Sequence, residues 1–335
     1  MKGIDMKKYL VVVFVCIILL FITEIPATAF QNMDSNLYVV KQGDTLPAIA
    51  KKYETTVEEL IRSNGLQSEA LLVGQKLRIP IYYEIEPGDT LKELASRFRS
   101  TVELIKESNS LSNDKLIAGQ VIFIPPKKLM MDGQHILLTK EEFADWLFNH
   151  QFKRNISLIQ EHHTFLPSYK HFHGNNHIKM LKSMEHFHKS KQGWNNIAQN
   201  LTTFPDGKVA ISRPFDSAPE GSIGSKANSV GIAIENVGNF DVGHDVMTKE
   251  QHDTIVYITA LLCLKFGLTP SVDSITYHHW WHYKTGERVL DNTPEYNVKS
   301  CPGTGFFGGN STASAKNYFY PLVLKRMEEI KANRE

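Results

Sequence analysis

The chain has little cysteine and no excess of charge of one sign. Three cysteines in 335 residues are too few for a disulfide framework. Basic and acidic residues number 37 and 36, which argues against nucleic acid as the main partner, because phosphate binding needs clustered cationic charge. A composition of 42% hydrophobic and 22% charged residues is ordinary for folded soluble protein. The length therefore indicates two or three folded domains.

The first 29 residues differ from the rest of the chain. Lys2, Lys7 and Lys8 precede an uncharged run over residues 9–22, and small residues follow at 27–29. This order is typical of a signal peptide, and we expect residues 1–29 to be cleaved off on export. An uncleaved membrane anchor is the alternative, since the apolar run is only a little shorter than the roughly 20 residues that span a bilayer. Cleavage would leave a secreted, almost neutral protein with no stable membrane association.

The sequence after this segment contains an internal repeat with a constant offset of 45 residues. The tetrapeptide Gly-Asp-Thr-Leu occurs at 43–46 and again at 88–91, and Asn64 recurs as Asn109. Each unit is patterned as strand, helix, helix, strand, and the aspartate before the first helix is well placed to cap it. The two units are residues 37–81 and 82–126.

Both units resemble the LysM module, a small glycan-binding fold with the order βααβ. The resemblance implies that each module holds N-acetylglucosamine-containing glycan between the Gly-Asp-Thr loop and the loop that follows the asparagine. Short polar side chains and backbone groups suit the hydroxyl and acetamido groups of a neutral sugar, and two modules in tandem raise apparent affinity. The alternative is that these residues only cap and end helices. The expected glycan-binding residues are Asp44, Thr45, Asn64, Asp89, Thr90 and Asn109.

A change of pattern marks the rest of the chain. Residues 127–135 are a polar connection without periodicity, and we expect a linker there. Residues 136–330 alternate short strand-like and helical patterns, which predicts an α/β domain with a mixed sheet flanked by helices. The expected helix boundaries are capping boxes at Thr139/Glu142 and Thr248/Gln251 and a terminal Gly267.

Histidines and one cysteine stand out in this region. Cys263 lies in an apolar helical run and is expected to be a buried small side chain. Cys301 instead lies in the glycine-rich stretch KSCPGTGFFGG, while the histidine pairs 162–163 and 278–279 each follow a strand-like segment. One thiolate with imidazoles is a zinc ligand set, and three protein ligands leave a fourth position open for water. A disulfide between the two cysteines is the alternative for the thiol.

The order of these motifs resembles the zinc-dependent N-acetylmuramoyl-L-alanine amidases of the peptidoglycan-recognition and bacteriophage type. The resemblance covers about residues 136–330 and is clearest at VKSCPG and SVGIAIENVGNF. It implies a zinc ion bound by His162, His278 and Cys301. Residues two apart in an extended segment point the same way, so Lys299 is expected to face the same site and stabilise an oxyanion.

The sequence indicates the general base less directly than it indicates the candidate metal ligands. A tyrosine that many family members have after their GW motif corresponds here to Gln199, which cannot accept a proton at neutral pH. A glutamate of other relatives corresponds to Ala233. Glu235 lies two residues further on the same strand face and is the candidate base or water-orienting group, with a purely structural acid as the alternative. Trp280 is expected either to contact substrate or to pack.

Together these features predict a secreted, cell-wall-associated peptidoglycan hydrolase. The resemblance implies cleavage of the amide bond between N-acetylmuramic acid and L-alanine, with the LysM modules on the glycan strands and the muramoyl-peptide in the catalytic cleft. Two alternatives are a peptidoglycan-binding protein without turnover and a zinc endopeptidase that acts within the stem peptide.

Overall fold

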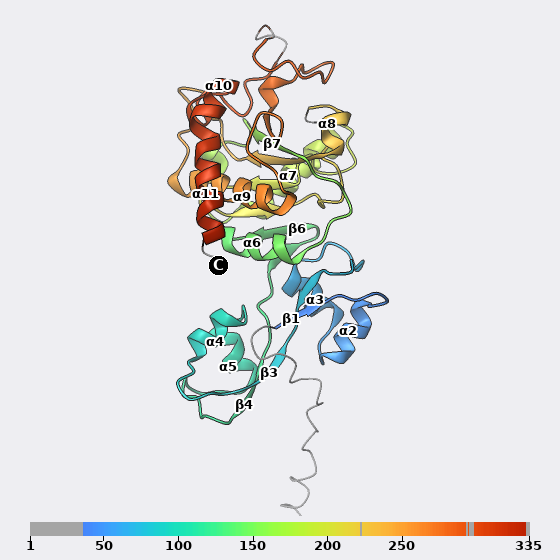
Figure 1. Cartoon of the computed structure of the whole chain (residues 1–335), viewed down its shortest axis with the longest axis vertical. Helices are drawn as coiled ribbons and strands as arrows, with labels where there is room; N and C mark the ends of the chain where they lie inside the picture. The colour runs from blue at the N-terminus through green and yellow to red at the C-terminus, as the bar shows by residue number, and fades with distance from the viewer. Residues whose placement is uncertain (1–35, 222, 293, 295–297, 333–335) are drawn as a thin grey trace, which may run out of the picture. The chain divides into compact units, whose positions relative to one another are not determined.

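A computed structural model describes residues 36–221, 223–292, 294 and 298–332 (Figure 1). The expected signal peptide, residues 1–29, lies outside the described residues. Within the described part, no helix has the length and apolar character needed to cross a membrane. The described chain divides into two compact units. One contains residues 36 and 79–126, and the other contains 37–78 and 127–332.

Each LysM unit forms the predicted strand, helix, helix, strand arrangement, with its two strands paired antiparallel. Leu46, Ile49 and Leu60 are among the buried side chains of the first unit, and Leu91, Phe98 and Ile105 are their counterparts in the second. The elements of the first unit are β1 Leu37–Val39, α2 Leu46–Lys52, α3 Val57–Asn64 and β2 Lys76–Arg78. Those of the second are β3 Ile81–Glu84, α4 Leu91–Arg97, α5 Val102–Ser108 and β4 Val121–Ile124.

The threonines, not the aspartates, cap the first helix of each LysM unit. The Thr45 and Thr90 hydroxyls accept the backbone N–H three residues later, at 3.4 and 3.2 Å. Asp44 accepts instead from the Tyr38 hydroxyl at 2.6 Å, and Asp89 accepts from its tyrosine counterpart at 3.0 Å. The expectation that the aspartates cap these helices is therefore wrong. They tie the preceding turn to the first strand.

The remaining strands form one mixed seven-stranded sheet in the order β11-β7-β10-β8-β9-β6-β5. Strands β11, β7, β10 and β8 are mutually parallel, and the rest of the sheet continues antiparallel. The bounds are β5 Met130–Asp132, β6 His135–Leu138, β7 Leu158–His163, β8 Leu201–Thr203, β9 Val209–Ile211, β10 Gly231–Asn236 and β11 Ile275–Tyr277. The stretch expected to be a linker, 127–135, thus contains edge strand β5 and the start of β6.

Helices cover both faces of this sheet. Alternate residues of a strand point to opposite faces. Ile136 and Leu138 of β6 join the core that includes helix α9, whereas Leu137 between them packs with helix α7. Helices α6 and α11 lie on the α9 side (Figure 1). The bounds are α6 Lys140–Asn149, α7 His177–Ser190, α8 Ser225–Ser229, α9 Lys249–Phe266, α10 Thr312–Ser314 and α11 Tyr320–Ala332.

The predicted helix boundaries are found with one difference. Thr139 and Glu142 form the complete reciprocal capping box of α6. Thr248 caps α9 by accepting the Gln251 N–H at 3.2 Å, and Gly267 ends it in a left-handed conformation. The Gln251 side chain does not return to the cap, because it is buried and bonds to strand β8. Only half of the second expected box is formed.

Candidate metal centre and active site

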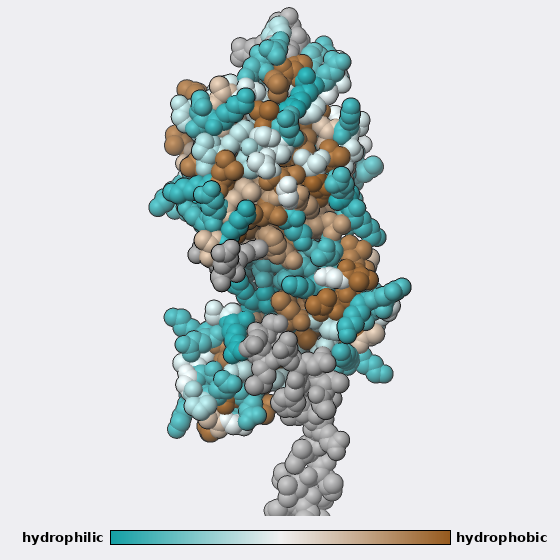
Figure 2. Space-filling view, viewed as in Figure 1, coloured by the Kyte–Doolittle hydropathy of each residue, from teal (hydrophilic) through white to brown (hydrophobic). Residues whose placement is uncertain are grey.

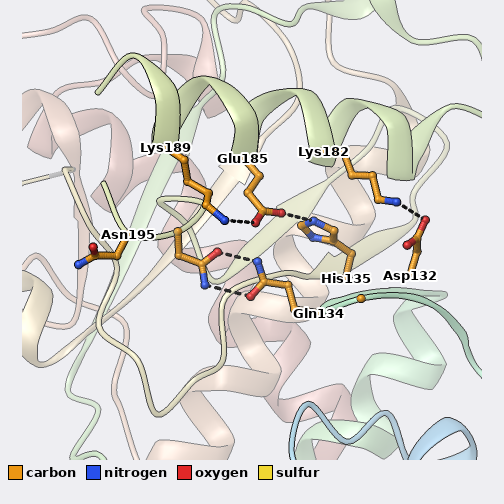
Figure 3. Close-up of a pocket in the computed structure, with 9 residues that line it drawn as sticks. Asp132, Gln134, His135, Lys182, Glu185, Lys189 and Asn195 are labelled. Atoms are coloured by element: carbon orange, nitrogen blue, oxygen red, sulfur yellow. Dashed lines mark hydrogen bonds and ion pairs between the residues drawn. The ribbon is translucent and has the colours of Figure 1, made fainter. Parts of the chain in front are cut away.

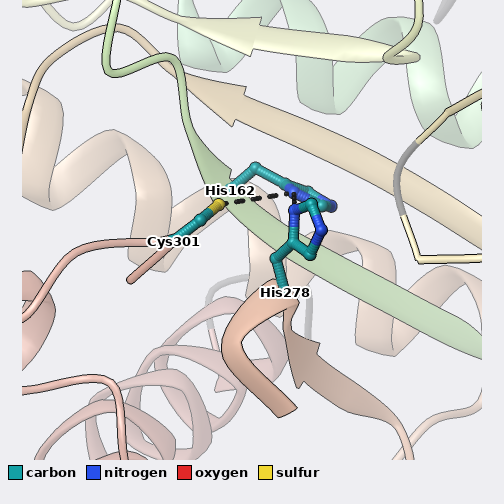
Figure 4. Close-up of side chains that lie close together, drawn as sticks. All are labelled: His162, His278 and Cys301. Atoms are coloured by element: carbon teal, nitrogen blue, oxygen red, sulfur yellow. Dashed lines mark hydrogen bonds between the residues drawn. The ribbon is translucent and has the colours of Figure 1, made fainter. Parts of the chain in front are cut away.

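Three buried side chains converge at the carboxyl ends of two neighbouring parallel strands (Figure 4). His162 lies near the end of β7, His278 directly follows β11, and Cys301 enters from a distant loop. His162 Nδ1 lies 3.2 Å from His278 Nδ1 and 3.5 Å from Cys301 Sγ. Crevices at the carboxyl ends of parallel strands are the usual binding sites of α/β sheets. The structure therefore brings together the three residues that the sequence singled out as ligands.

The distances between the potential ligand atoms suit an ion with tetrahedral coordination. Two nitrogens about 2.0–2.1 Å from such an ion lie about 3.3 Å apart, and a sulfur at about 2.3 Å lies about 3.6 Å from each. The potential ligand atoms of this cluster all lie within 4.8 Å of one another. Both cysteines in the described chain are free, so the alternative of a disulfide between Cys263 and Cys301 is wrong. Cys263 is buried in α9, as predicted.

Burial sets the protonation of the three side chains. It lowers the pKa of His162 to about 3, helped by the charge of Lys299. It also holds the pKa of His278 well below its usual range, with nearby His162 adding to the effect. The pKa of the Cys301 thiol is raised well above its usual range, first by burial and then by Glu235. The imidazoles are thus neutral, as metal ligands must be, whereas the thiol must lose a proton to bind a metal.

The loop that carries Cys301 is fixed by hydrogen bonds on both sides. Asp241 accepts from the Ser300 hydroxyl and from the Thr304 backbone N–H, both at 3.0 Å. His279 donates its backbone N–H to the Cys301 carbonyl, and its Nδ1 lies 2.7 Å from the Lys299 carbonyl oxygen. The second histidine of the pair therefore holds the loop that supplies the third ligand.

Gly303 lets this loop approach the segment after β10 closely. Its φ is +118°, and a Cβ here would lie 2.5 Å from the Phe240 carbonyl carbon. Both the conformation and the space thus require glycine. The glycine in the sequence CPG has a packing role as well as a turning role.

Lys299 lies at the exposed edge of the cluster. Its positive charge depresses the pKa of His162 and opposes the rise of that of Glu235, so the ammonium lies within electrostatic reach of both. Its charge also acts on the Cys301 thiol. That Lys299 serves one site with Cys301 and stabilises an oxyanion stays a prediction.

Glu235 lies beside the first ligand in the sheet. Its Cα pairs with that of His162 on one side and with that of Thr202 on the other, so the three side chains leave the same face. Its Oε2 is buried and has no hydrogen-bond partner within the described residues. Burial raises the pKa of Glu235 to about 8, although Lys299 opposes the rise.

The other residues expected around the centre have packing roles. Gln199 is buried and donates its amide to the Thr202 hydroxyl at 3.0 Å, and Ala233 is buried in β10. Trp280 is 0% exposed, stacks on Tyr277 and donates its indole N–H to a backbone carbonyl. In this structure it packs, so the expected substrate contact at Trp280 is not supported.

A buried polar network behind His162 was not anticipated. Asn236 donates its amide to the His162 carbonyl at 2.8 Å and to the Glu161 carboxylate at 3.0 Å. The Thr259 hydroxyl of α9 donates to the same carboxylate, and the Thr203 hydroxyl donates to the Asn236 side-chain oxygen Oδ1. Burial raises the pKa of Glu161 to about 7. Polar residues within apolar strand and helix segments are the sequence signal that could have shown this network.

In both LysM units the repeated asparagine is used internally. The Asn64 amide group donates to the carbonyls of Leu60 and Arg78, and its oxygen accepts the Arg78 N–H. Asn109 makes the same three bonds in the second unit. These bonds join the second helix to the last strand. A direct glycan contact by either asparagine stays a prediction.

A separate polar hollow of about 440 Å³ lies between the β5–β6 hairpin and helix α7 (Figure 3). Strands β10, β8 and β9 separate β6 from the strand that carries His162. His135 and Glu185 pair at 2.8 Å, and the Gln134 and Asn196 amides exchange hydrogen bonds at 2.6 and 2.9 Å. The polar groups that line this hollow thus pair largely with one another. In the centre around His162, by contrast, Glu235 Oε2 has no partner within the described residues.

Comparison with known proteins gives short but specific similarities. The chain is 50% identical over 46 residues to the cortical fragment-lytic enzyme of Bacillus subtilis (strain 168), which is 13% of this chain and 11% of that protein. It is 49% identical over 43 residues to the N-acetylmuramoyl-L-alanine amidase sle1 of Staphylococcus epidermidis, which is 13% of each. The chain therefore spans only a small part of these curated relatives.

Two solved structures are similar to this chain in part. One is the endolysine N-acetylmuramoyl-L-alanine amidase LysCS from Clostridium intestinale URNW, at 20% identity over 46% of this chain and 78% of that chain, with a TM-score of 0.33. The other is Drosophila PGRP-LB, at 19% identity over 50% and 84%, with a TM-score of 0.37. In sequence, residues 38–80 and 83–125 match the LysM domain. Residues 152–304, which contain all three candidate ligands, match the N-acetylmuramoyl-L-alanine amidase family.

Proposed function

We propose that this chain is a secreted peptidoglycan hydrolase that cleaves the amide bond between N-acetylmuramic acid and L-alanine. The convergence of His162, His278 and Cys301 inside an amidase-family domain is the observation that carries this proposal. Two neutral imidazoles and one thiolate suit zinc, and three protein ligands leave a coordination position open, as in catalytic rather than structural sites. A bound zinc ion would supply Lewis acidity to the amide carbonyl and to water.

Two side chains of the protein would act in the reaction: one would transfer the proton and the other would stabilise the developing negative charge. Glu235 would take a proton from the attacking water and pass it to the nitrogen that leaves, which becomes the free amine of L-alanine. A base whose pKa lies near the working pH suits this task, and burial brings the pKa of Glu235 to about 8. Lys299 would stabilise the negative charge that develops on the carbonyl oxygen.

The two LysM modules would keep the enzyme on the glycan strands of the wall. Their Gly-Asp-Thr loops, residues 43–45 and 88–90, are exposed or half-buried and carry the hydroxyl and carboxylate groups described above. The protein surface is a mixture of polar and apolar side chains on the face shown in Figure 2. With its balanced charge, such a surface suits a largely neutral sugar polymer better than a polyanion.

Mass spectrometry of digested peptidoglycan tests the bond that is cut. We expect free stem peptides with an N-terminal L-alanine and no new reducing sugar ends. New reducing ends would show glycosidase action, and fragments cut within the stem would show an endopeptidase; either result contradicts the proposal. Unchanged wall turbidity with and without a chelator would favour a binding protein without turnover.

A further inference from the structure

The first LysM module packs against the amidase domain within one compact unit, which contains residues 37–78 together with the described residues from 127 onward. Contact is made by the end of α3, the loop after it and strand β2 on one side, and by α6 and the chain before it on the other. The hydrogen bonds are Trp146 Nε1–H to the Gly65 carbonyl at 3.1 Å, Gln67 Nε2–H to the Gln134 carbonyl at 2.7 Å and Leu129 N–H to the Arg62 carbonyl at 2.9 Å.

An ion pair with little solvent exposure reinforces this contact. The Arg78 guanidinium donates two hydrogen bonds to the Asp145 carboxylate, one of them at 2.8 Å. The arginine side chain is 11% exposed and the aspartate 26%. A bidentate pair of this kind fixes orientation, and loss of the aspartate removes both hydrogen bonds.

The internal repeat shows that this contact is specific to the first module. At the offset of 45 residues, Arg78 corresponds to Phe123, which cannot form the ion pair. The position of Gln67 is likewise changed, to Ser112. The second module therefore shares the fold of the first but lacks the two side chains that bond the first module to Asp145 and to the Gln134 carbonyl.

A comparison of Gly65 with its counterpart Ser110 shows whether the backbone conformation or the contact with α6 requires glycine. Both are left-handed, with φ of +59° and +53°, so this conformation alone does not require glycine. A Cβ at Gly65 would lie 3.1 Å from atoms of both Leu129 and Trp146. Gly65 is buried and Ser110 is exposed. The glycine of the first module is thus explained by the close approach of the Trp146 ring.

The contact uses the start of the loop after Asn64 but leaves the rest of the expected glycan-binding loops open. Residues 63–66 are buried, whereas residues 41–45 and 68–73 are exposed or half-buried. We propose that the first LysM module is a fixed, substrate-positioning part of the catalytic unit, which holds a glycan strand at a set distance from the catalytic centre. The second module lacks the residues for this task. The identity of the glycan rests on the function proposed above.

Hydrogen exchange measured by mass spectrometry on the full mature chain tests the docking itself. Asparagine tolerates the left-handed conformation, so Gly65→Asn and Ser110→Asn form a matched pair that differs in what the new side chain meets. We expect exchange in residues 37–78 and in α6 to become faster by about tenfold or more in Gly65→Asn. Ser110→Asn should leave these segments unchanged.

A second variant tests whether faster exchange reflects loss of docking rather than unfolding of the LysM module. Asp145→Ala removes the partner of Arg78 while every residue of the LysM module stays in place, and it should also speed exchange in 37–78. Arg326→Ala, which removes a surface pair on α11, is its control. Exchange in 37–78 that is equal in the wild type, Gly65→Asn and Asp145→Ala would overturn the proposal.

Activity measurements separate the docking from the proposed reaction. On a soluble muramoyl-peptide, Asp145→Ala should equal the wild type, and on intact peptidoglycan it should be slower by about tenfold. Equal rates on both substrates would contradict the positioning role even if docking is confirmed. If the wild type cleaves neither substrate, the proposed reaction fails while the exchange result still stands.

Discussion

At the scale of single residues, Cys301 is a candidate ligand because of its neighbours and not because of its own acidity. Burial and Glu235 raise the pKa of its thiol, so the metal-free protein holds it protonated. Metal binding must release this proton, and affinity should therefore rise with pH. The same burial removes water from the two histidines, which keeps both imidazoles neutral and ready to bind.

The first prediction concerns this thiol. Cys301→Ser replaces a soft thiolate with a hydroxyl that binds zinc poorly, so bound zinc and wall-lytic activity should both fall, the affinity by at least about 100-fold. Equilibrium dialysis with metal analysis measures the first and turbidity the second. Cys263→Ala, at the other described cysteine, should keep its zinc. Full zinc content in Cys301→Ser would contradict the ligand assignment.

A second residue-scale prediction concerns His150, which is not part of the candidate metal cluster. It is buried at the end of α6, and its Nδ1–H donates to the Trp146 carbonyl at 2.7 Å. Burial lowers its pKa to about 4, below the value near 6.5 of an unfolded chain. The unfolded state therefore binds the proton more readily, and stability is lost as pH falls from 6.5 to 4.

His150→Asn keeps a donor for the carbonyl but removes the titration. Across this pH window its free energy of unfolding should fall by about 3 kcal/mol less than that of the wild type. Urea unfolding at pH 7 and pH 4 measures the difference. His173→Asn, at an exposed histidine, is the control. Parallel pH curves for the wild type and His150→Asn would refute the effect.

At the scale of elements, the loop over residues 299–305 depends on Asp241 for its position. This carboxylate accepts from Ser300 and Thr304, on both sides of Cys301, and so fixes this candidate ligand relative to the strands. Asp241→Ala should reduce zinc affinity by about 10–100-fold while the fold is retained, as loss of a residue that orients a ligand does.

The control for Asp241→Ala is Asp273→Ala, whose partner Arg288 lies on the surface. Circular dichroism checks the fold, and competition with a coloured chelator gives the affinity. Asp241→Asn should recover part of the affinity, since its amide oxygen can still accept one hydrogen bond. An unchanged affinity in Asp241→Ala would mean that the loop is held by His279 and its other contacts alone.

The sequence predicts helices and strands well where the pattern that indicates them is local. Hydrophobic periodicity and the Thr139–Glu142 spacing indicate α6, and the strand-like run before His162 indicates β7. The three residues that converge could be named as candidate ligands because histidine and cysteine carry their chemistry in their side chains. Roles that depend on distant partners could not be predicted: the edge strand β5, the choice between packing and substrate contact at Trp280, and the network around Asn236 all need tertiary contacts.

At the scale of the whole molecule, the metal cluster belongs to only one of the two compact units. His162, His278 and Cys301 all lie in the larger unit, whereas residues 79–126 have a hydrophobic core of their own. A ligand stabilises only the unit whose folded state binds it. The sequence repeat suggests two equivalent modules, but only the first belongs to the compact unit that contains the candidate metal cluster, so we expect only the first to respond to a metal.

Removal of the metal should therefore separate two unfolding transitions in calorimetry. With zinc about 1,000-fold above its dissociation constant, binding adds about 4 kcal/mol, so a chelator should lower the midpoint of the larger unit by roughly 10 °C. The transition of the second LysM module should not move, whereas the first module should unfold with the amidase domain. The fragment 79–126 is the control for the small transition. A chelator-induced shift of that transition, or no shift of the larger one, would contradict the assignment of the metal to residues of the larger unit.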